Sequence, residues 1–347
     1  MHTADNNYAF SALAAVEGLR LDAEQAAVLR GGLQSGFLAR CMHPVTVEDL
    51  AESTALDRSR VEHLCRALRA IDVLHEEFGH YRLAPFYAAL VTGGADGYAL
   101  DVLNGSAVRQ QLFTDLFASA GSAAFWSLGH AEQRALAASV SVDPFTSHGR
   151  TVMTSLIEGN PAWHEAFSTG ARYLEFGCGL SGAMLAAAAM YPALSGVGID
   201  ISADLINVAR ARAVALGLSD RIDFIVADAA VYTYPHPFDV VLWSQFFFSS
   251  ASRPAVLANA RAQLRPGGLL IAPVLIPAEQ PETIRSALDT LLVRSWEVPP
   301  MTSAELEFEV AAAGFVDITV HRNRFGTMLL ARRPSLVGRD ERGSSVR

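Results

Sequence analysis

The stretch ARYLEFGCGLSGAMLAAAAM, residues 171–190, decides the fold. It begins with an apolar run typical of a buried strand, passes through a glycine-rich turn, and continues into residues that favour a helix. Gly177, Gly179 and Gly182 give the spacing GxGxxG directly after the strand. Such glycines permit a tight turn and let a ligand approach the backbone at the helix N-terminus. Because the motif alone is a weak signal, its surroundings must support it.

Alternating strands and helices continue downstream of this turn. A second strand ends in Asp200, which lies 23 residues after Gly177, and an acid about 20 residues after the first glycine suits the hydroxyl pair of a ribose. Further strands are expected at 222–228, 238–243, 264–274 (a turn, then a strand), 315–322 and 325–333. The last two are close enough in sequence to form an antiparallel hairpin. The region therefore predicts an α/β domain, a Rossmann-like doubly wound sheet with an antiparallel terminal hairpin.

Glu175 distinguishes between two classes of cofactor that this plan can bind. It precedes Gly177 by two residues, and a carboxylate there attracts the ammonium of an amino acid but repels the pyrophosphate of a dinucleotide. Residues 171–332 resemble the class I methyltransferases that depend on S-adenosylmethionine (SAM). The matching motifs are LEFGCG (174–179), GIDIS (198–202), VADA (226–229) and LRPGGLL (264–270). The resemblance implies SAM as the cofactor.

The segment 43–85 predicts a winged helix. Thr46 followed by Asp49 is a capping-box pattern, and Asp57 is placed to cap a second helix. Two short strands around a glycine turn follow. The segment holds five arginines and eight acidic residues, unlike the basic surface of a DNA-binding protein. We therefore expect a scaffold or dimerisation role for it, and no nucleic-acid partner.

The whole chain divides into four parts on these patterns. We expect a winged-helix and dimerisation domain at 1–90, a mainly helical linker and pocket lid at 91–170, a SAM-binding Rossmann-like domain at 171–333 and a disordered tail at 334–347. With the winged helix included, nearly the whole chain resembles the small-molecule O-methyltransferases. That resemblance implies a small-molecule substrate and a homodimer.

Carried over by position, the resemblance also assigns the cofactor-binding residues. From the methionine end of SAM to its adenine, they are Glu175, Gly177, Cys178, Gly179, Ser244, Asp200, Ile201, Ala229 and Asp228. Asp200 would accept the ribose hydroxyls, and Asp228 would accept the adenine amine. Cys178 is expected to be a small residue of the turn and not a nucleophile.

The stretch FDVVLWSQFFFSS, residues 238–250, carries phenylalanine where O-methyltransferases of this plan have a histidine that deprotonates the acceptor hydroxyl. Serine, glutamine and phenylalanine cannot serve as a general base near neutral pH. His148 is the replacement candidate. Aromatic rings can instead hold a sulfonium by cation–π attraction, worth about 0.5–2 kcal/mol per contact, or simply pack in the core. The rings considered are Trp126, Tyr173, Trp243, Phe246 and Phe247.

Composition narrows the function classes further. All 27 basic residues are arginine, which excludes a phosphate-binding or Schiff-base lysine, and the net charge is −9. The three cysteines are typical of reduced thiols in the cytoplasm. The N-terminus does not resemble a secretory signal, and no apolar run approaches the roughly 18–20 residues of a membrane span. No metal is expected, since the spacing of His75 and His80 matches no ligand motif.

Three functions remain open at this point. The first is a methyltransferase acting on a small molecule whose nucleophile needs little activation. The second is a SAM cyclase of methyltransferase fold, in which the amine of SAM attacks its own γ-carbon to give azetidine-2-carboxylate and methylthioadenosine. The third is a winged-helix regulator that senses SAM, which the acidic charge disfavours. A polar cavity for a second substrate would favour the first, and a small apolar cavity the second.

Overall fold

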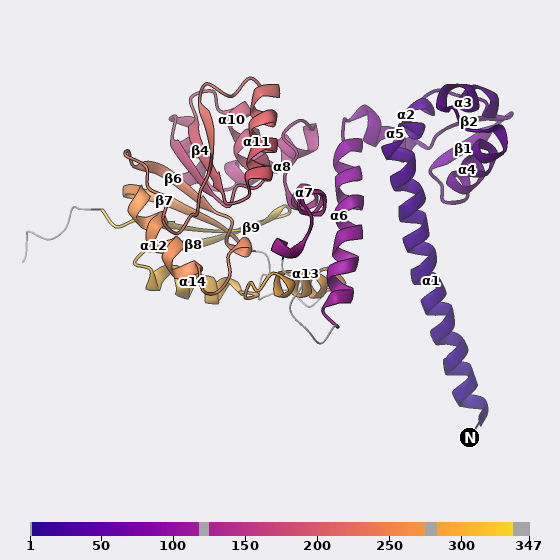
Figure 1. Ribbon diagram of the computed structural model, residues 1–347. Coiled ribbons are helices and arrows are strands. Elements are labelled where there is room, and N and C mark those ends of the chain that lie inside the picture. The colour runs from indigo at the N-terminus through magenta and orange to yellow at the C-terminus, as the bar shows by residue number, and fades with distance from the viewer. Residues whose placement is uncertain (1, 118–124, 275–282, 336–347) are drawn as a thin grey trace, which may run out of the picture. The chain divides into compact units, whose positions relative to one another are not determined.

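The computed structural model describes residues 2–117, 125–274 and 283–335, except for the side chains of residues 2–10 and Trp126 (Figure 1). Most of the predicted tail and the ring of Trp126 thus lie outside the described residues. The chain divides into two compact units, Met1–Ser106 and Ala107–Arg347. The division falls inside helix α6 (Asp96–Asp115), whereas the sequence suggested boundaries at 90 and 170. The helices after α6 therefore belong to the same unit as the sheet.

The first unit contains a helix–turn–helix followed by a hairpin. Its elements are α1 (His2–Gln34), α2 (Phe37–Arg40), α3 (Val47–Thr54), α4 (Arg58–Ala70), β1 (Leu74–Glu77), β2 (His80–Leu83) and α5 (Pro85–Thr92). Thr46 and Asp49 form the predicted capping box of α3, and the Asp57 side chain accepts from the Arg60 N–H to cap α4. β1 and β2 pair antiparallel. Leu50, Val61 and other apolar side chains bury a small core between these elements.

The second unit is a doubly wound sheet. Its elements are α6 from Ala107 on, η1 (Phe125–Ser127), α7 (His130–Val140), α8 (Ser147–Glu158), α9 (Pro161–Ser168), β3 (Arg172–Phe176), α10 (Gly182–Met190), β4 (Ser195–Asp200), α11 (Ala203–Ala215), β5 (Ile222–Val226), β6 (Phe238–Trp243), η2 (Gln245–Phe247), α12 (Arg253–Gln263), β7 (Leu264–Val274), α13 (Ile284–Ser295), α14 (Ser303–Ala312), β8 (Val316–Asn323) and β9 (Gly326–Arg332).

The strand order is β5-β4-β3-β6-β7-β9-β8. The first five of these strands are parallel, while β9 runs antiparallel to both β7 and β8. This confirms the predicted Rossmann-like sheet with its terminal hairpin. The order reverses between β3 and β6, and at such a switch point the carboxyl ends of the strands leave a crevice for ligands.

One detail of β7 differs from the prediction of a turn followed by a strand. β7 already begins at Leu264, which pairs with Phe238, and the register then jumps so that Leu269 pairs with Val240. Gly267 has φ +74° within this irregular stretch, and a glycine adopts that conformation without the strain of a Cβ. The turn is thus a bulge inside the strand.

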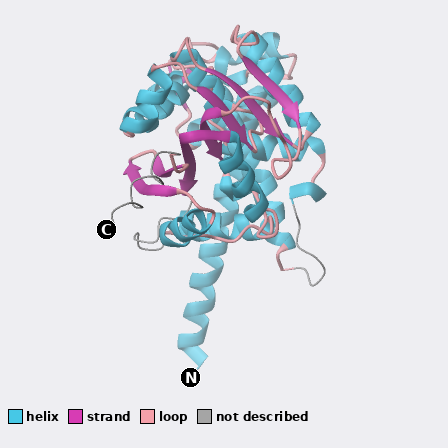
Figure 2. Ribbon diagram, turned by 90° about the vertical axis from the view of Figure 1, so that its left-hand side faces the viewer, coloured by secondary structure: helices cyan, strands magenta, loops and turns pink. Residues whose placement is uncertain are grey.

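Helices cover both faces of the sheet, and each face has its own core (Figure 2). One core joins Tyr173 of β3 to side chains of α8, α9, α10 and α11. The other joins Leu174 and Phe176 of β3 to side chains of α12 and α14. Successive side chains of a strand point to opposite faces, so β3 is buried on both sides and contributes to both cores.

The third glycine of the GxGxxG motif is needed for packing. A Cβ on Gly182 would lie 1.8 Å from the Val142 carbonyl oxygen and 2.5 Å from Ser141 Oγ. The segment after α7 therefore lies directly on the first residue of α10. Gly177 and Gly179 are needed for conformation instead, because their φ angles are +69° and +51°.

We predict that Gly182→Ala destabilises the second unit by about 1–3 kcal/mol, because backbone atoms must move to admit the methyl group. Urea unfolding followed by circular dichroism measures the change. Gly326→Ala is the matched control, since a Cβ there would make contacts of 3.8 Å. Wild-type stability of Gly182→Ala would show that residues 141–142 do not rest on α10 in solution.

Candidate functional site

A cavity of about 200 Å³ opens at the carboxyl ends of β3 and β6. Glu175, Gly177 and Ser244 line it from these two strands and the turns that follow them. Side chains of α7, α8 and α9, among them Met153 and Trp163, complete the wall together with residues of β7 and β9. The cavity therefore lies at the switch point of the sheet, where the sequence placed the cofactor.

The glycine turn is fixed to the end of β4. The Gly177 and Cys178 N–H groups both donate to the Ile199 carbonyl oxygen at 3.0 Å. The Gly179 N–H donates to Asp200 Oδ2 at 2.9 Å. The other carboxylate oxygen of Asp200 accepts from the Ser202 N–H at 2.9 Å. The turn and the acid that follows β4 are thus held as one piece.

Asp200 keeps capacity for further hydrogen bonds, since each carboxylate oxygen has two lone pairs. Burial raises its pKa, and the backbone N–H bonds oppose that rise. The neighbouring Ile201 has 52% of its surface exposed. Asp200 is thus placed to accept from the hydroxyls of a sugar, and Ile201 to pack against a flat base attached to that sugar.

Glu175 is a buried carboxylate, 3% exposed, at the end of β3. Ser181 Oγ donates to its Oε2 at a long 3.4 Å, and the Met184 backbone also bonds to it. Ser181 itself has φ +53°, a strained conformation for a residue with a side chain. Burial raises the pKa of Glu175 to about 8, and the charge of Asp200 adds to the rise. An ionised Glu175 would therefore be strongly stabilised by a cationic group in the cavity.

Asp228 and Ala229 follow β5 at the same edge of the sheet. The Ala227 N–H donates to the Asp200 carbonyl oxygen at 3.0 Å, which brings this loop beside the end of β4. Asp228 is exposed, and its Oδ1 accepts from the Ala230 N–H at 2.8 Å. Neither Asp228 nor Ala229 lines the cavity. They are placed beside it, where the exposed end of a long ligand could reach them.

The turn after β6 forms the aromatic part of the wall. Phe246 and Phe247 both line the cavity, with ring centroids 4.6 Å apart. The ring of Trp296 also contacts Phe247, with ring centroids 5.6 Å apart. The sequence analysis did not identify Trp296, because it is more than forty residues away along the chain.

Trp243, which the sequence predicts beside the cofactor, is not among the residues that line this cavity. Leu242 and Ser244 line the cavity, whereas Trp243 between them points to the opposite face of the sheet. There its ring is fully buried and lies 4.7 Å from the guanidinium carbon of Arg253. The alternation of side chains along a strand explains the difference.

Two further predicted residues also lie away from the cavity. His148 is an exposed residue in the first turn of α8 and is not part of the lining. Tyr173 is fully buried, with its ring 5.2 Å from Phe167 in the core. Neither residue faces the space that Glu175 lines. His148 is on the exposed side of α8, and Tyr173, two residues before Glu175 in β3, packs in the core.

A buried arginine holds the aromatic turn in place. Arg253 donates to the Gln245 carbonyl oxygen at 2.7 Å and to Gln245 Oε1 at 2.8 Å. It also forms a two-point ion pair with Glu309, at 2.9 and 2.6 Å. Gln245 Nε2 in turn donates to the carbonyl oxygen of Pro273, another cavity residue. The position of Phe246 and Phe247 is therefore fixed from behind by charge-assisted hydrogen bonds.

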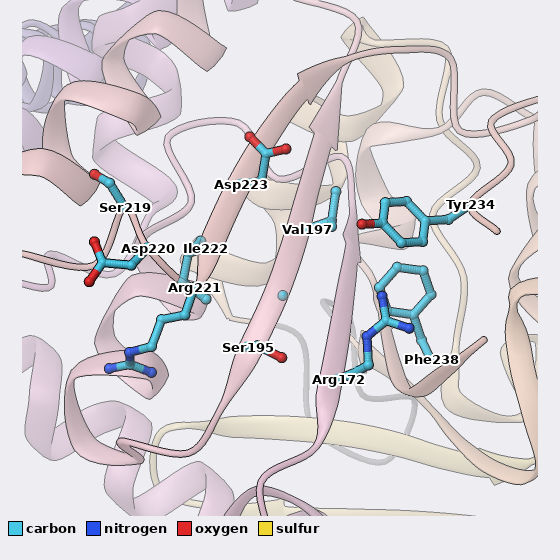
Figure 3. Close-up of a pocket in the computed structure, with 11 residues that line it drawn as sticks. Arg172, Ser195, Val197, Ser219, Asp220, Arg221, Ile222, Asp223, Tyr234 and Phe238 are labelled. Carbon is cyan, nitrogen blue, oxygen red and sulfur yellow. The ribbon is translucent and has the colours of Figure 1, made fainter. Parts of the chain in front are cut away.

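A second hollow, of about 280 Å³, lies at the amino ends of the parallel strands (Figure 3). Arg172, Ser195, Ile222 and Phe238, the first residues of four parallel strands, all line it. The Arg172 guanidinium lies 4.9 Å from the Phe238 ring centroid. In folds of this type ligands bind at the carboxyl ends of the strands. The cavity at Glu175, and not this hollow, is thus the candidate site.

Within the described residues, no group of three or more His, Cys, Asp or Glu side chains is arranged to hold a metal ion. No helix in the described part of the chain is both long and apolar enough to cross a membrane.

Comparisons with known proteins agree with this geometry. Residues 174–268 match the model of a family described as methyltransferase domain. The uncharacterized protein YjhP of Escherichia coli strain K12 is 32% identical over 134 residues, a match that spans 37% of this chain and about half, 48%, of that protein.

Solved structures resemble nearly the whole chain. An O-methyltransferase family protein from Burkholderia thailandensis has a TM-score of 0.71 at 16% identity, covering 93% of this chain and 98% of that one. Human N-acetylserotonin methyltransferase in complex with SAM has a TM-score of 0.66 at 14% identity, covering 93% and 98%. CalO1, a methyltransferase of calicheamicin biosynthesis with bound S-adenosylhomocysteine, has a TM-score of 0.62 at 18% identity, covering 94% and 99%. The chain has the fold of the class I SAM-dependent methyltransferases.

We predict that Glu175 makes the protein less stable as the pH rises. Its pKa in the folded state, about 8, exceeds the usual value of 4.5. The contribution of the protonated form is complete below pH 4.5 and is lost as the pH rises towards 8. Between pH 5 and pH 8, the unfolding free energy of the wild type should fall by roughly 3 kcal/mol relative to Glu175→Gln.

Urea unfolding of both proteins at a series of pH values tests this. The exposed Glu165→Gln is the control for losing one carboxylate. If the unfolding free energies of the wild type and Glu175→Gln changed with pH in the same way, Glu175 would not be a buried group with a raised pKa.

Proposed function

We propose that this protein is a SAM-dependent methyltransferase that acts on a small molecule without a histidine base. The observation that carries the proposal is the pair of carboxylates around the glycine turn, Glu175 buried and Asp200 half-buried. Glu175 lines the cavity, and Asp200 is bonded to the Gly179 N–H at 2.9 Å. SAM combines an ammonium, a sulfonium and a ribose, and this pair of acids matches the first and the last of these groups.

Each residue of the turn would contact a part of the cofactor. Glu175 would pair with the α-ammonium, and Gly177 and Gly179 would let the methionine part lie against the backbone. Asp200 would accept the ribose hydroxyls beside the exposed Ile201, with Asp228 and Ala229 at the adenine. Ser244 and the small Cys178 would border the methionine part. When bound, SAM supplies a methyl group on a positively charged sulfur, ready for displacement.

The aromatic and apolar wall would support that displacement. Phe246 and Phe247 line the cavity, and ring faces attract a cation by about 0.5–2 kcal/mol per contact, depending on desolvation. Apolar side chains such as Met153 and Leu242 exclude water from the reacting atoms. The methyl acceptor must therefore be reactive without proton removal by a histidine, as amines, thiols, activated carbons and acidic hydroxyls are.

A second candidate, the SAM cyclase, is favoured by the composition of the cavity. Its described lining is mainly apolar, and Glu175 is the charged side chain within it. In the cyclisation, Glu175 would take a proton from the SAM amine. The amine nitrogen then bonds to its own γ-carbon as the carbon–sulfur bond breaks, and methylthioadenosine leaves with the electron pair. The SAM-sensing regulator is not proposed, because residues 174–268 match a methyltransferase domain.

A homodimer in the cytoplasm belongs to the same proposal. In the first unit, α1 carries Leu13, Val16 and Leu19 with 65%, 61% and 72% of their surfaces exposed. Apolar side chains along one helix are a suitable surface for a second copy of the chain.

We predict that Asp200→Asn weakens binding of S-adenosylhomocysteine by about 10–100-fold, since hydrogen bonds to a charged group are worth about 1.5–3 kcal/mol. Titration calorimetry measures the dissociation constants. Asp220→Asn, a change of the same type in the hollow at the amino ends of the parallel strands, is the control (Figure 3). Equal weakening by both changes, or no binding to the wild type, would argue against this cofactor site.

We further predict that the protein, incubated with SAM alone, forms no methylthioadenosine above an enzyme-free control. Mass spectrometry of the nucleosides gives the answer without an acceptor being chosen. Methylthioadenosine together with an equal amount of azetidine-2-carboxylate would replace methyl transfer with cyclisation.

A further inference from the structure

The charge of the cavity limits which acceptors it can hold. Glu175 is buried in its wall, and Asp200 is near enough to raise the pKa of Glu175 further. The described lining of the cavity contains no arginine, lysine or histidine, so an anionic acceptor would find no cationic side chain there to pair with. The electrostatics thus favour an uncharged or cationic acceptor.

The aromatic wall favours a product that carries positive charge. Phe246 and Phe247 line the cavity edge to face, at 4.6 Å and an interplanar angle of 64°. Trp296 supports Phe247 from 5.6 Å, and Arg253 holds the turn through Gln245. These contacts fix the turn that carries the rings, which lowers the cost of arranging them around a cation.

The movement of charge during methyl transfer decides which nucleophile suits an aromatic wall. When an uncharged nitrogen or sulfur atom attacks, its bond to the methyl carbon forms as the methyl–sulfur bond of SAM breaks. The electron pair of the broken bond stays on sulfur, and the positive charge passes to the acceptor atom. No proton leaves in this step. A hydroxyl acceptor would have to lose a proton, at a place where the wall presents Phe246 and Phe247.

Resting on the proposed methyl transfer, we infer that the acceptor is a small, uncharged nitrogen or sulfur nucleophile that becomes an onium cation on methylation. Aromatic ring nitrogens, tertiary amines and thioethers have this chemistry.

Three one-ring probes of matched size test the inference with the full chain and SAM: 3-methylpyridine, pyridine-3-carboxylate and 3-methylphenol. Mass spectrometry quantifies S-adenosylhomocysteine and the methylated product. We expect kcat/KM for 3-methylpyridine to exceed that for either other probe by about 100-fold at pH 7. At saturating SAM, whose ammonium would keep Glu175 ionised, kcat with 3-methylpyridine should stay flat between pH 7 and pH 9, because the uncharged ring nitrogen is already the reactive form.

The variant Phe247→Leu tests the role of the wall. It removes the ring but keeps an apolar side chain, and should lower kcat/KM for 3-methylpyridine by about tenfold, within the range of one cation–π contact. Phe308→Leu, at an α14 residue with 77% of its surface exposed, is the matched control and should leave the rate unchanged.

The outcomes separate this inference from the proposal on which it rests. Faster turnover of the phenol or the carboxylate overturns the acceptor class and leaves methyl transfer standing. No turnover of the three probes by a protein that binds S-adenosylhomocysteine overturns the acceptor class as well. Failure to bind S-adenosylhomocysteine, or methylthioadenosine as the product, overturns the proposed methyl transfer itself.

Discussion

The turn between β3 and α10 is held by two groups at the end of β4, one backbone carbonyl and one carboxylate. The Ile199 carbonyl oxygen accepts from the Gly177 and Cys178 N–H groups, and the Asp200 carboxylate accepts from the Gly179 N–H. These bonds place the first residue of α10, Gly182, against the backbone of residues 141–142. The same arrangement leaves Glu175 below the turn with little access to water. These bonds therefore fix both the turn that lines the cavity and the contact between α10 and residues 141–142.

Burying Glu175 carries a cost that the fold alone does not require. Its carboxylate has one long hydrogen bond from Ser181 and one backbone partner, and its pKa is raised to about 8. Groups perturbed in this way concentrate at functional sites, where a ligand supplies the missing partner. A cationic ligand would pair with the buried Glu175 carboxylate. The free energy lost by burying that carboxylate would then be recovered when the ligand binds.

The wall after β6 shows how a site can be rigid without containing acid–base groups. Arg253 is 1% exposed and bonds at once to Glu309 and Gln245 while lying over Trp243. A buried arginine is tolerated only with such partners. Its effect is to fix the short turn that carries Phe246 and Phe247. Precise placement of rings, in place of proton transfer, is what this part of the cavity offers to a reaction.

Much of the fold could be predicted from local patterns. The strand–turn–helix at Glu175, the caps at Thr46 and Asp57 and the terminal hairpin all depend on neighbours in the chain, and the structure has them. Gly177, Cys178, Gly179, Ser244, Phe246 and Phe247, all selected from sequence patterns, line the cavity. Trp243, Tyr173 and His148 do not line it, and residue type alone does not reveal which side of a strand or helix faces a cavity.

The sequence by itself determined the α/β class, the glycine turn and the acids at the strand ends, since these are set by residues within a few positions of one another. Only the tertiary structure decided that Gly182 is required by Val142, that Trp296 supports Phe247 and that Arg253 holds the aromatic turn. Those contacts join segments between eight and about fifty residues apart. No local periodicity records such contacts, because they arise only when strands and helices pack together.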